Sequence, residues 1–168
     1  MWILSTRMAP QVAFTIPFFL AFRWLGLADT VVGLALVYLT FNLALVIWMM
    51  KSYFDSVPRE LEEAAWIDGC SRLRVLVLIV LPLSRPALST VAVLTFLSVW
   101  NDFLWPLVVI ATPDNMTVQL GLATFQSAHF TNWPVLMAAT MISQIPVFVL
   151  FLVGQRWFVQ SIASTGIK

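Results

Sequence analysis

The sequence predicts an all-α membrane protein, because its composition is too apolar for a soluble fold and because it contains four long apolar stretches. Hydrophobic residues make up 61% of the 168 residues and charged residues 10%, whereas soluble domains average about 45–50% and about 25%. A bilayer can cover this apolar surface, since lipid replaces water as the solvent there. The formal net charge of +1 excludes a strongly basic surface for nucleic acid.

Four apolar stretches are expected to cross the membrane, at residues 1–22, 30–50, 87–111 and 135–158. Each has the roughly 20 residues needed to span a hydrocarbon core. Because every backbone amide in lipid needs an internal hydrogen-bond partner, each span is predicted to be helical. The runs do not alternate in hydropathy, which argues against the strands of a barrel.

The connection between the second and third spans, residues 51–85, is the most charged part of the chain. It holds five of the nine basic residues, whereas residues 112–134 contain no Lys or Arg. The positive-inside rule therefore places residues 51–85 in the cytoplasm of a cell whose inner membrane holds the spans. With four alternating spans, the C-terminus is expected on the same side.

This connection is predicted to form two short helices joined at a glycine, which we call the elbow (residues 58–82). Ser56 is the expected cap of the first helix. Gly69 can adopt a left-handed conformation and end that helix. Ser71 is expected to cap a second helix that runs to about Leu81, and Pro82 is expected to break it.

The elbow carries a spaced motif that resembles the cytoplasmic signature of one transporter family. Its three parts are Glu63-Ala64-Ala65, then Gly69 after three residues, then Ile79-Val80-Leu81-Pro82 after nine more. This arrangement resembles the "EAA" signature of binding-protein-dependent ABC importer permeases. The flanks of the motif, the segment Trp100–Pro106 and the tail Gln155–Lys168 resemble the carbohydrate branch, and are similar to the second permease of maltose transporters.

The resemblance implies the transmembrane domain of a type I ABC importer, with residues 1–168 forming a single domain. Such permeases usually have six spans, so the four counted here imply an N-terminally truncated chain. The implied function is import of a sugar or polyol by alternating access, with no catalytic residues and no cofactor in this chain. The implied partners are a cytoplasmic ATP-binding subunit dimer, a second permease subunit, an extracellular or periplasmic solute-binding protein and membrane lipid.

The resemblance also implies roles for seven residues that would couple the elbow to the ATPase: Glu63, Ala64, Ala65, Asp68, Gly69, Leu81 and Pro82. Glu63 would contact the ATPase or the elbow's own backbone, and the two alanines would allow close packing. Asp68 would cap the second helix or bind a basic ATPase residue, while Gly69 makes the turn. Leu81 and Pro82 would end the element. The alternative for each is a plain cytoplasmic helix hairpin.

Three residues in the third span are candidates for the translocation path: Trp100, Asn101 and Asp102. A charge inside a span is costly and often functional, and an aromatic ring beside polar groups suits a sugar. The alternative, which we favour, is that Asp102 pairs with a neighbouring helix or reaches the outer interface. His129 is expected to be a solvated loop residue, and residues 112–134 either contact a solute-binding protein or form a plain exposed loop.

Other classes of function remain as alternatives. An intramembrane enzyme or metal site would need a convergent set of ionisable residues, and the chain has one His and one Cys. A passive channel or structural membrane protein would have no reason for the spaced elbow. An importer of a non-sugar solute is a further alternative, and only the flanking resemblance argues against it.

Overall fold

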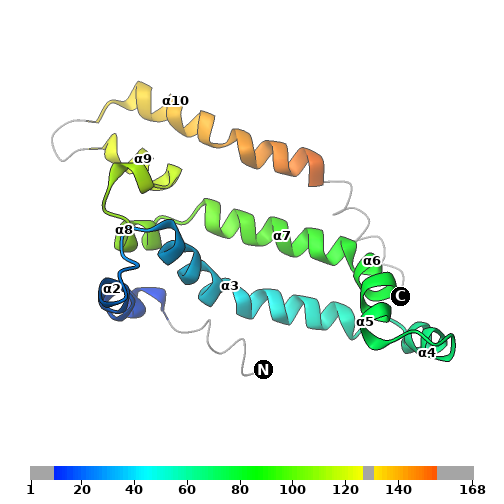
Figure 1. The fold of residues 1–168 in the computed structure, drawn as a ribbon. Coiled ribbons are helices and arrows are strands. Elements are labelled where there is room, and N and C mark those ends of the chain that lie inside the picture. Colours follow the sequence, from blue (N-terminus) through cyan, green and yellow to red (C-terminus); the bar gives the residue numbers. More distant parts are fainter. Residues whose placement is uncertain (1–9, 127–130, 155–168) are drawn as a thin grey trace.

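The computed structural model describes residues 10–126 and 131–154, and over these ranges the protein is helical (Figure 1). One isolated bridge, between Gln126 and Thr131, joins the two ranges. The predicted all-α fold is confirmed for these residues. His129, the tail from Gln155 and the start of the first expected span lie outside the described residues.

Two helices are long and apolar enough to cross a membrane. They are α3 (Val31–Phe54, 24 residues) and the 22-residue helix Trp133–Gly154, which begins as α10 (Trp133–Ser143). A third crossing exists if the bent pair Arg72–Leu83 and Arg85–Trp100 counts as one span. Helix α7 (Arg85–Trp100) packs along α3 (Figure 1). The indole Nε1 of Trp100 donates to the Ser143 carbonyl of α10 at 3.2 Å.

The shorter helices connect these three. Their bounds are η1 Gln11–Phe14, α2 Thr15–Trp24, α4 Arg59–Ile67, α5 Arg72–Val75, a π-helical turn Leu76–Val80, α6 Leu81–Leu83, α8 Leu104–Val109, η3 Pro113–Asn115 and α9 Val118–Thr124. Helices α4 to α6 lie at one end of α3 and α7, whereas α8 and α9 lie at the other end (Figure 1).

Two expected spans differ from the observed helices. In the first, the described α-helix is the ten-residue α2, which begins at Thr15 and ends beyond the expected boundary. The third, residues 87–111, is interrupted after Trp100, and α8 begins only at Leu104. Pro106 explains this break, because in a continuous helix its ring would clash with the carbonyl of Asp102 and it could donate no hydrogen bond.

The core lies where α2, α3 and α8 meet. Its most buried members are Val37 and Trp105, which are 0% and 2% exposed. The Trp105 ring stacks on Phe41 at 4.9 Å between centroids, and Phe18 packs against both rings. Aromatic pairs of this kind add about 0.5–1.5 kcal/mol to the burial of their area, so this cluster fixes α8 against α3.

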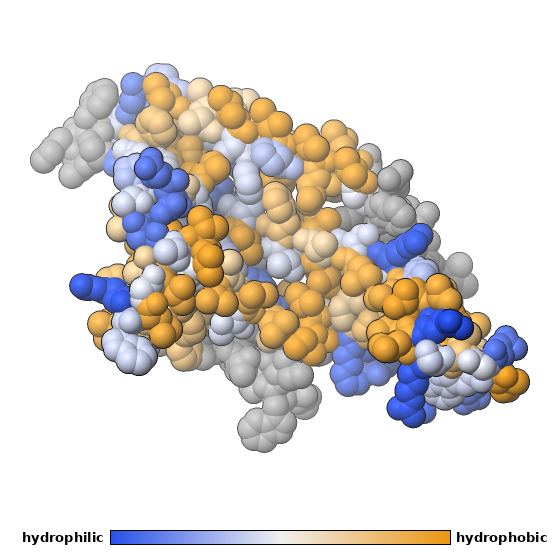
Figure 2. All heavy atoms as spheres, viewed as in Figure 1, coloured by the Kyte–Doolittle hydropathy of each residue, from blue (hydrophilic) through white to orange (hydrophobic). Residues whose placement is uncertain are grey.

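Large apolar side chains cover much of the outer surface (Figure 2). On α10, Met141 is 76% exposed and Ile142 is 66% exposed. In water such a surface would drive association, since monomeric soluble proteins rarely expose contiguous apolar patches beyond a few hundred Å². In a bilayer the same side chains face lipid at no cost, as the composition predicts. The hydrophilic residues gather near the two ends of the molecule (Figure 2).

At the end of the molecule opposite the elbow, the Asp29 carboxylate joins the connection between α2 and α3 to the segment that follows α8. Asp29, at φ +57°, accepts hydrogen bonds at Oδ1 from the backbone amides of Ala111 (2.9 Å) and Thr112 (3.0 Å) and from the Thr112 hydroxyl (3.2 Å). Asn115 Nδ2 donates to the Asp29 carbonyl at 2.8 Å. The Thr112 and Ala111 amides hold the pKa of the Asp29 carboxyl below its usual value of 3.8.

Replacing Asp29 with Ala should remove these hydrogen bonds, and hydrogen exchange at the Ala111 and Thr112 amides should become several-fold faster. Because the pKa of Asp29 is lowered in the folded state, its hydrogen bonds stabilise the protein fully at a pH above the ordinary pKa of Asp. This stabilisation is lost as the pH falls through the lowered pKa. Asp114→Ala is the control, since Asp114 is exposed on the same connection. Equal exchange rates in Asp29→Ala and the parent would contradict this assignment.

Candidate functional site

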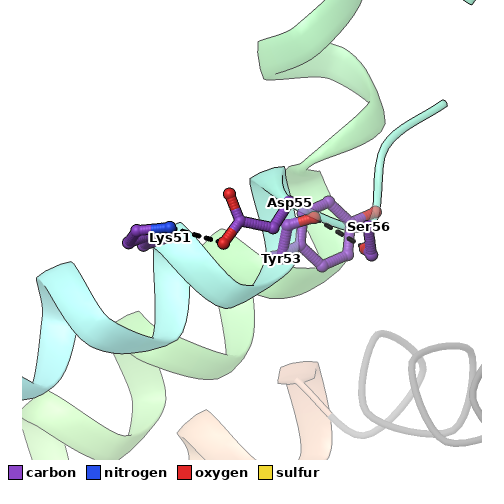
Figure 3. Close-up of polar contacts among 4 residues, drawn as sticks. All are labelled: Lys51, Tyr53, Asp55 and Ser56. Carbon is purple, nitrogen blue, oxygen red and sulfur yellow. Dashed lines mark hydrogen bonds and ion pairs between the residues drawn. The ribbon is translucent and has the colours of Figure 1, made fainter. Parts of the chain in front are cut away.

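The end of α3 is closed by its own side chains. Lys51 pairs with Asp55 one turn on, and the Ser56 hydroxyl donates to the Tyr53 carbonyl at 2.6 Å (Figure 3). The ion pair is well exposed and so contributes little to stability. The expectation that Ser56 caps the next helix is wrong, because Pro58 is the N-cap residue of α4 and no side chain caps it. The Ser56 hydroxyl instead serves the last turn of α3.

The predicted left-handed turn at Gly69 is present, with φ +80°. The Gly69 amide donates to the Trp66 carbonyl at 3.0 Å, and the Cys70 amide donates to the Ala65 carbonyl at 2.9 Å. These two bonds form a Schellman motif, which satisfies the last carbonyls of α4. A Cβ at Gly69 would meet no atom within 4 Å. Backbone conformation, not lack of space, therefore favours glycine here.

The two alanines of α4 differ in exposure. Ala65 is 6% exposed and packs in a small cluster with Val75 and Val80. Ala64 and Glu63 are exposed on the outer side of α4. Helical geometry turns successive side chains about 100° apart. Ala65 therefore packs inside the elbow, and only Ala64 is available for close packing against another protein.

The side chains of Glu63 and Asp68 are exposed, and their carboxylates make no hydrogen bond or ion pair within the part of the chain that the structure describes. Asp68 therefore does not cap α5. Ser71 occupies the expected N-cap position of α5, but its hydroxyl makes no capping hydrogen bond. Both carboxylates are free to meet groups outside the described chain.

The second arm of the elbow does not stop at Pro82. The helix runs from Arg72 to Leu83 and bends by 70° into α7 at Ser84. Pro82 cannot donate to the carbonyl four residues earlier, and the chain there widens into the π-helical turn Leu76–Val80. Ser84 is fully buried, and its hydroxyl donates to the Val80 carbonyl at 2.6 Å. The helix end predicted at about Leu81 thus lies two residues later, at Leu83.

Tyr53 joins the end of α3 to the start of α7. Its hydroxyl donates to the Leu83 carbonyl at 2.7 Å, across thirty residues of sequence. The acceptor lies at the 70° bend, where helical hydrogen bonding is interrupted. Tyr53 cannot be singled out from sequence, because nothing in its spacing indicates a partner on another helix.

A pocket of about 500 Å³ opens between the end of α3 and the outer side of α4. Three acidic residues and one basic residue line it beside apolar and aromatic side chains: Asp55, Glu62, Glu63, Arg59, Phe54, Val57 and Trp66. Of the residues that the resemblance singled out, only Glu63 reaches this pocket.

The three candidate path residues have different surroundings in the described part of the chain. Trp100 lines an apolar pocket of about 420 Å³ against α9 and α10. Asn101 is exposed, and its Nδ2 donates to the Leu97 carbonyl of its own helix at 2.9 Å. Asp102 accepts from the Tyr38 hydroxyl of α3 at 3.1 Å and from the Trp105 amide at 3.2 Å. Asp102 therefore pairs with a neighbouring helix and also holds the first turn of α8.

The chain belongs to the family described as binding-protein-dependent transport system inner membrane component, whose model matches residues 1–164. It is 38% identical over 96% of its length to a probable ABC transporter permease of Bacillus subtilis, YurM, and covers 53% of that protein. It is 36% identical over 99% of its length to the trehalose/maltose permease MalG of Thermococcus litoralis, covering 60% of it.

A solved structure shares the fold. It is a bacterial ABC transporter for import of the acidic polysaccharide alginate, with a TM-score of 0.69 and 30% identity over 85% of this chain and 55% of that one. The chain thus spans little more than half the length of these relatives. The predicted family and its type of transmembrane fold are confirmed.

Replacing Tyr53 with Phe removes one hydrogen bond, worth about 0.5–1.5 kcal/mol net. The change should loosen the contact between α3 and the start of α7 without unfolding either helix. Spin labels at Ser52 and Arg85, in a Cys70→Ser background, should report a broader distance distribution with a similar mean. Ser56→Ala serves as the control, because its hydroxyl bonds only within its own turn. An unchanged distance distribution in Tyr53→Phe would show that the bond to Leu83 does not hold α3 and α7 together.

Proposed function

We propose that this chain is part of the permease subunit of an ABC importer that moves a sugar or polyol into the cytoplasm. Family membership supports the permease class. The names of several similar proteins support the substrate class, since they refer to trehalose and maltose, arabinooligosaccharides and maltodextrin. These names describe those proteins, and their carbohydrates are the first candidates to test here.

In this proposal the elbow receives the movement of a separate cytoplasmic ATPase dimer and passes it to α3 and α7. The observation that carries the proposal is that the two arms of the elbow pack against each other, while the other side of α4 is exposed. Ala65 and the Gly69 turn hold α4 against α5, while Glu63, Ala64 and Asp68 face outward. Leu81 and Pro82 belong to the second arm, which extends to the bend at Ser84.

The outward side of α4 has the chemistry to dock on another protein. Ala64 offers little bulk, so a partner can approach the helix closely. Glu63 and Asp68 offer carboxylates that make no bond within the described residues. ATP would then shift the spans between inward-facing and outward-facing states only through the ATPase's different affinity for the two.

The path for the solute is proposed to pass the break between α7 and α8. Trp100 and Asn101 lie at the end of α7, and Asp102 lies within the break. A second permease subunit would complete the path, and a solute-binding protein would deliver the sugar from the other side. In this arrangement the elbow and the C-terminus face the cytoplasm, as the distribution of Lys and Arg predicts.

Gly69→Pro tests the coupling part of the proposal. Proline fixes φ near about −65° and removes the amide that bonds Trp66, so the turn cannot form. The variant subunit should insert into the membrane at normal levels. It should lose co-purification with the ATPase, and uptake of radiolabelled maltose, trehalose or maltodextrin by cells should fall to background.

Gly26→Pro is the matched control. Gly26 also has a positive φ, +69°, and its amide also donates to a carbonyl at a helix end, that of Arg23. It lies between α2 and α3, at the end of α3 that is far from the elbow. It should spare ATPase co-purification. Undiminished ATPase binding and uptake in Gly69→Pro would rule out the elbow as the coupling element. Uptake of none of these sugars by the parent would instead reject the substrate class.

A further inference from the structure

The second arm of the elbow, Arg72–Leu83, leaves α7 at a steep angle. The bend between the two helices is 70°, whereas membrane-spanning helices tilt from the membrane normal by about 20° on average. With α7 as a span, the second arm therefore runs closer to the membrane plane than to the membrane normal. Figure 1 shows α4 farther from the spans than α5 and α6. This geometry places the second arm at the surface of the bilayer.

The second arm exposes apolar side chains that the rest of the elbow leaves uncovered. Val75 and Val80 are buried in the cluster with Ala65 of α4. In contrast, Leu73, Val77 and Leu78 are 75%, 56% and 64% exposed. Apolar residues also cover the region of α5 and α6 in Figure 2. Because the transfer of apolar surface out of water is favourable, these side chains favour an apolar environment over the cytoplasm.

The second arm is also basic, whereas α4 is acidic. Residues 69–101 contain three arginines and no Asp or Glu: Arg72, Arg74 and Arg85. All three are exposed and form no ion pair within the described part of the chain. Residues 59–68 contain four acidic residues and one basic residue. The elbow thus separates its charges, and the basic arm lies nearer to the spans.

We propose that the second arm binds anionic phospholipid at the cytoplasmic surface of the membrane. The arginines contact the lipid phosphates, and the exposed leucines and valine lie at the boundary between headgroups and acyl chains. Basic and apolar side chains occur together in helices that lie in the membrane interface. An arginine stem can follow an apolar surface while its charged end reaches a headgroup. The guanidinium group can also bind phosphate through two parallel hydrogen bonds.

The distribution of charge favours lipid over another protein as the partner of this arm. The cytoplasmic leaflet is negatively charged and attracts basic segments close to its surface. The same surface repels the acidic arm, α4. Lipid on the second arm would therefore hold the elbow with α4 turned toward the cytoplasm. The proposal depends neither on which solute is transported nor on how α4 meets the ATPase.

Spin labelling of the complete importer in lipid nanodiscs tests this proposal. A nitroxide at Leu78, with Cys70 replaced by Ser, reports its collisions with oxygen, which concentrates in lipid, and with a neutral nickel chelate, which stays in water. In nanodiscs of equal parts phosphatidylglycerol and phosphatidylcholine, the ratio of oxygen to chelate collisions should be high. It should fall several-fold in Arg72→Gln/Arg74→Gln, and in the parent protein in phosphatidylcholine alone.

Arg59→Gln is the control variant, because it removes an exposed arginine from the acidic arm, and it should leave the ratio at Leu78 unchanged. A label at Glu60 on α4 should report water in both lipid mixtures. The same ratio at Leu78 in both mixtures would overturn the proposal. So would a label that neither oxygen nor the chelate reaches, because another subunit would then cover the arm. If the double variant fails to assemble, the comparison of the two mixtures in the parent decides.

Discussion

The left-handed backbone at Gly69 is the constraint on which the rest of the elbow depends. At φ +80° the chain reverses and closes α4 with two backbone hydrogen bonds. The reversal brings Ala65 against Val75 and Val80, so the elbow has a small core of its own. Nine residues of α4 alone would be marginal as an isolated helix. Packing against the second arm is what makes this segment a stiff element that can transmit force.

Three interruptions between Arg59 and Val109 divide this part of the chain into stiff pieces, and each has an identifiable physical cause. Glycine makes the turn at Gly69, Pro86 in the first turn of α7 prevents a continuous helix through the bend at Ser84, and Pro106 ends the helix that would otherwise run through Asp102. A hydrogen bond between distant helices crosses the last two. Tyr53 binds the carbonyl at Leu83, and Tyr38 binds Asp102. Breaks that are held in this way can act as defined joints, whereas unrestrained loops would absorb the movement of a partner.

Much of the fold could be predicted from sequence because lipid imposes simple rules. Composition and run length predict helices, and the spaced glycine motif predicts both the family and the turn. The boundary at Pro82 and the unbroken third span were less predictable, since proline interrupts hydrogen bonds at a distance of four residues and the surrounding helix can adapt by a π-turn. The partners of Tyr53 and Asp102 were beyond sequence reasoning, because they depend on how α3 packs against its neighbours. The different exposure of Ala64 and Ala65 could have been predicted from helical periodicity, had the inner face of α4 been known.

The central claim is that the elbow moves as one rigid body when ATP binds to the partner subunits. Double electron–electron resonance in the assembled importer, with Cys70 replaced by Ser, tests this directly. A label pair at Glu60 and Arg74, which are exposed on the two arms, should give the same distance with and without ATP. A pair that joins Glu60 to the corresponding elbow of the second permease subunit should change its distance. A nucleotide-dependent change between Glu60 and Arg74 would contradict the account, because it would show that the turn at Gly69 flexes instead of transmitting the movement.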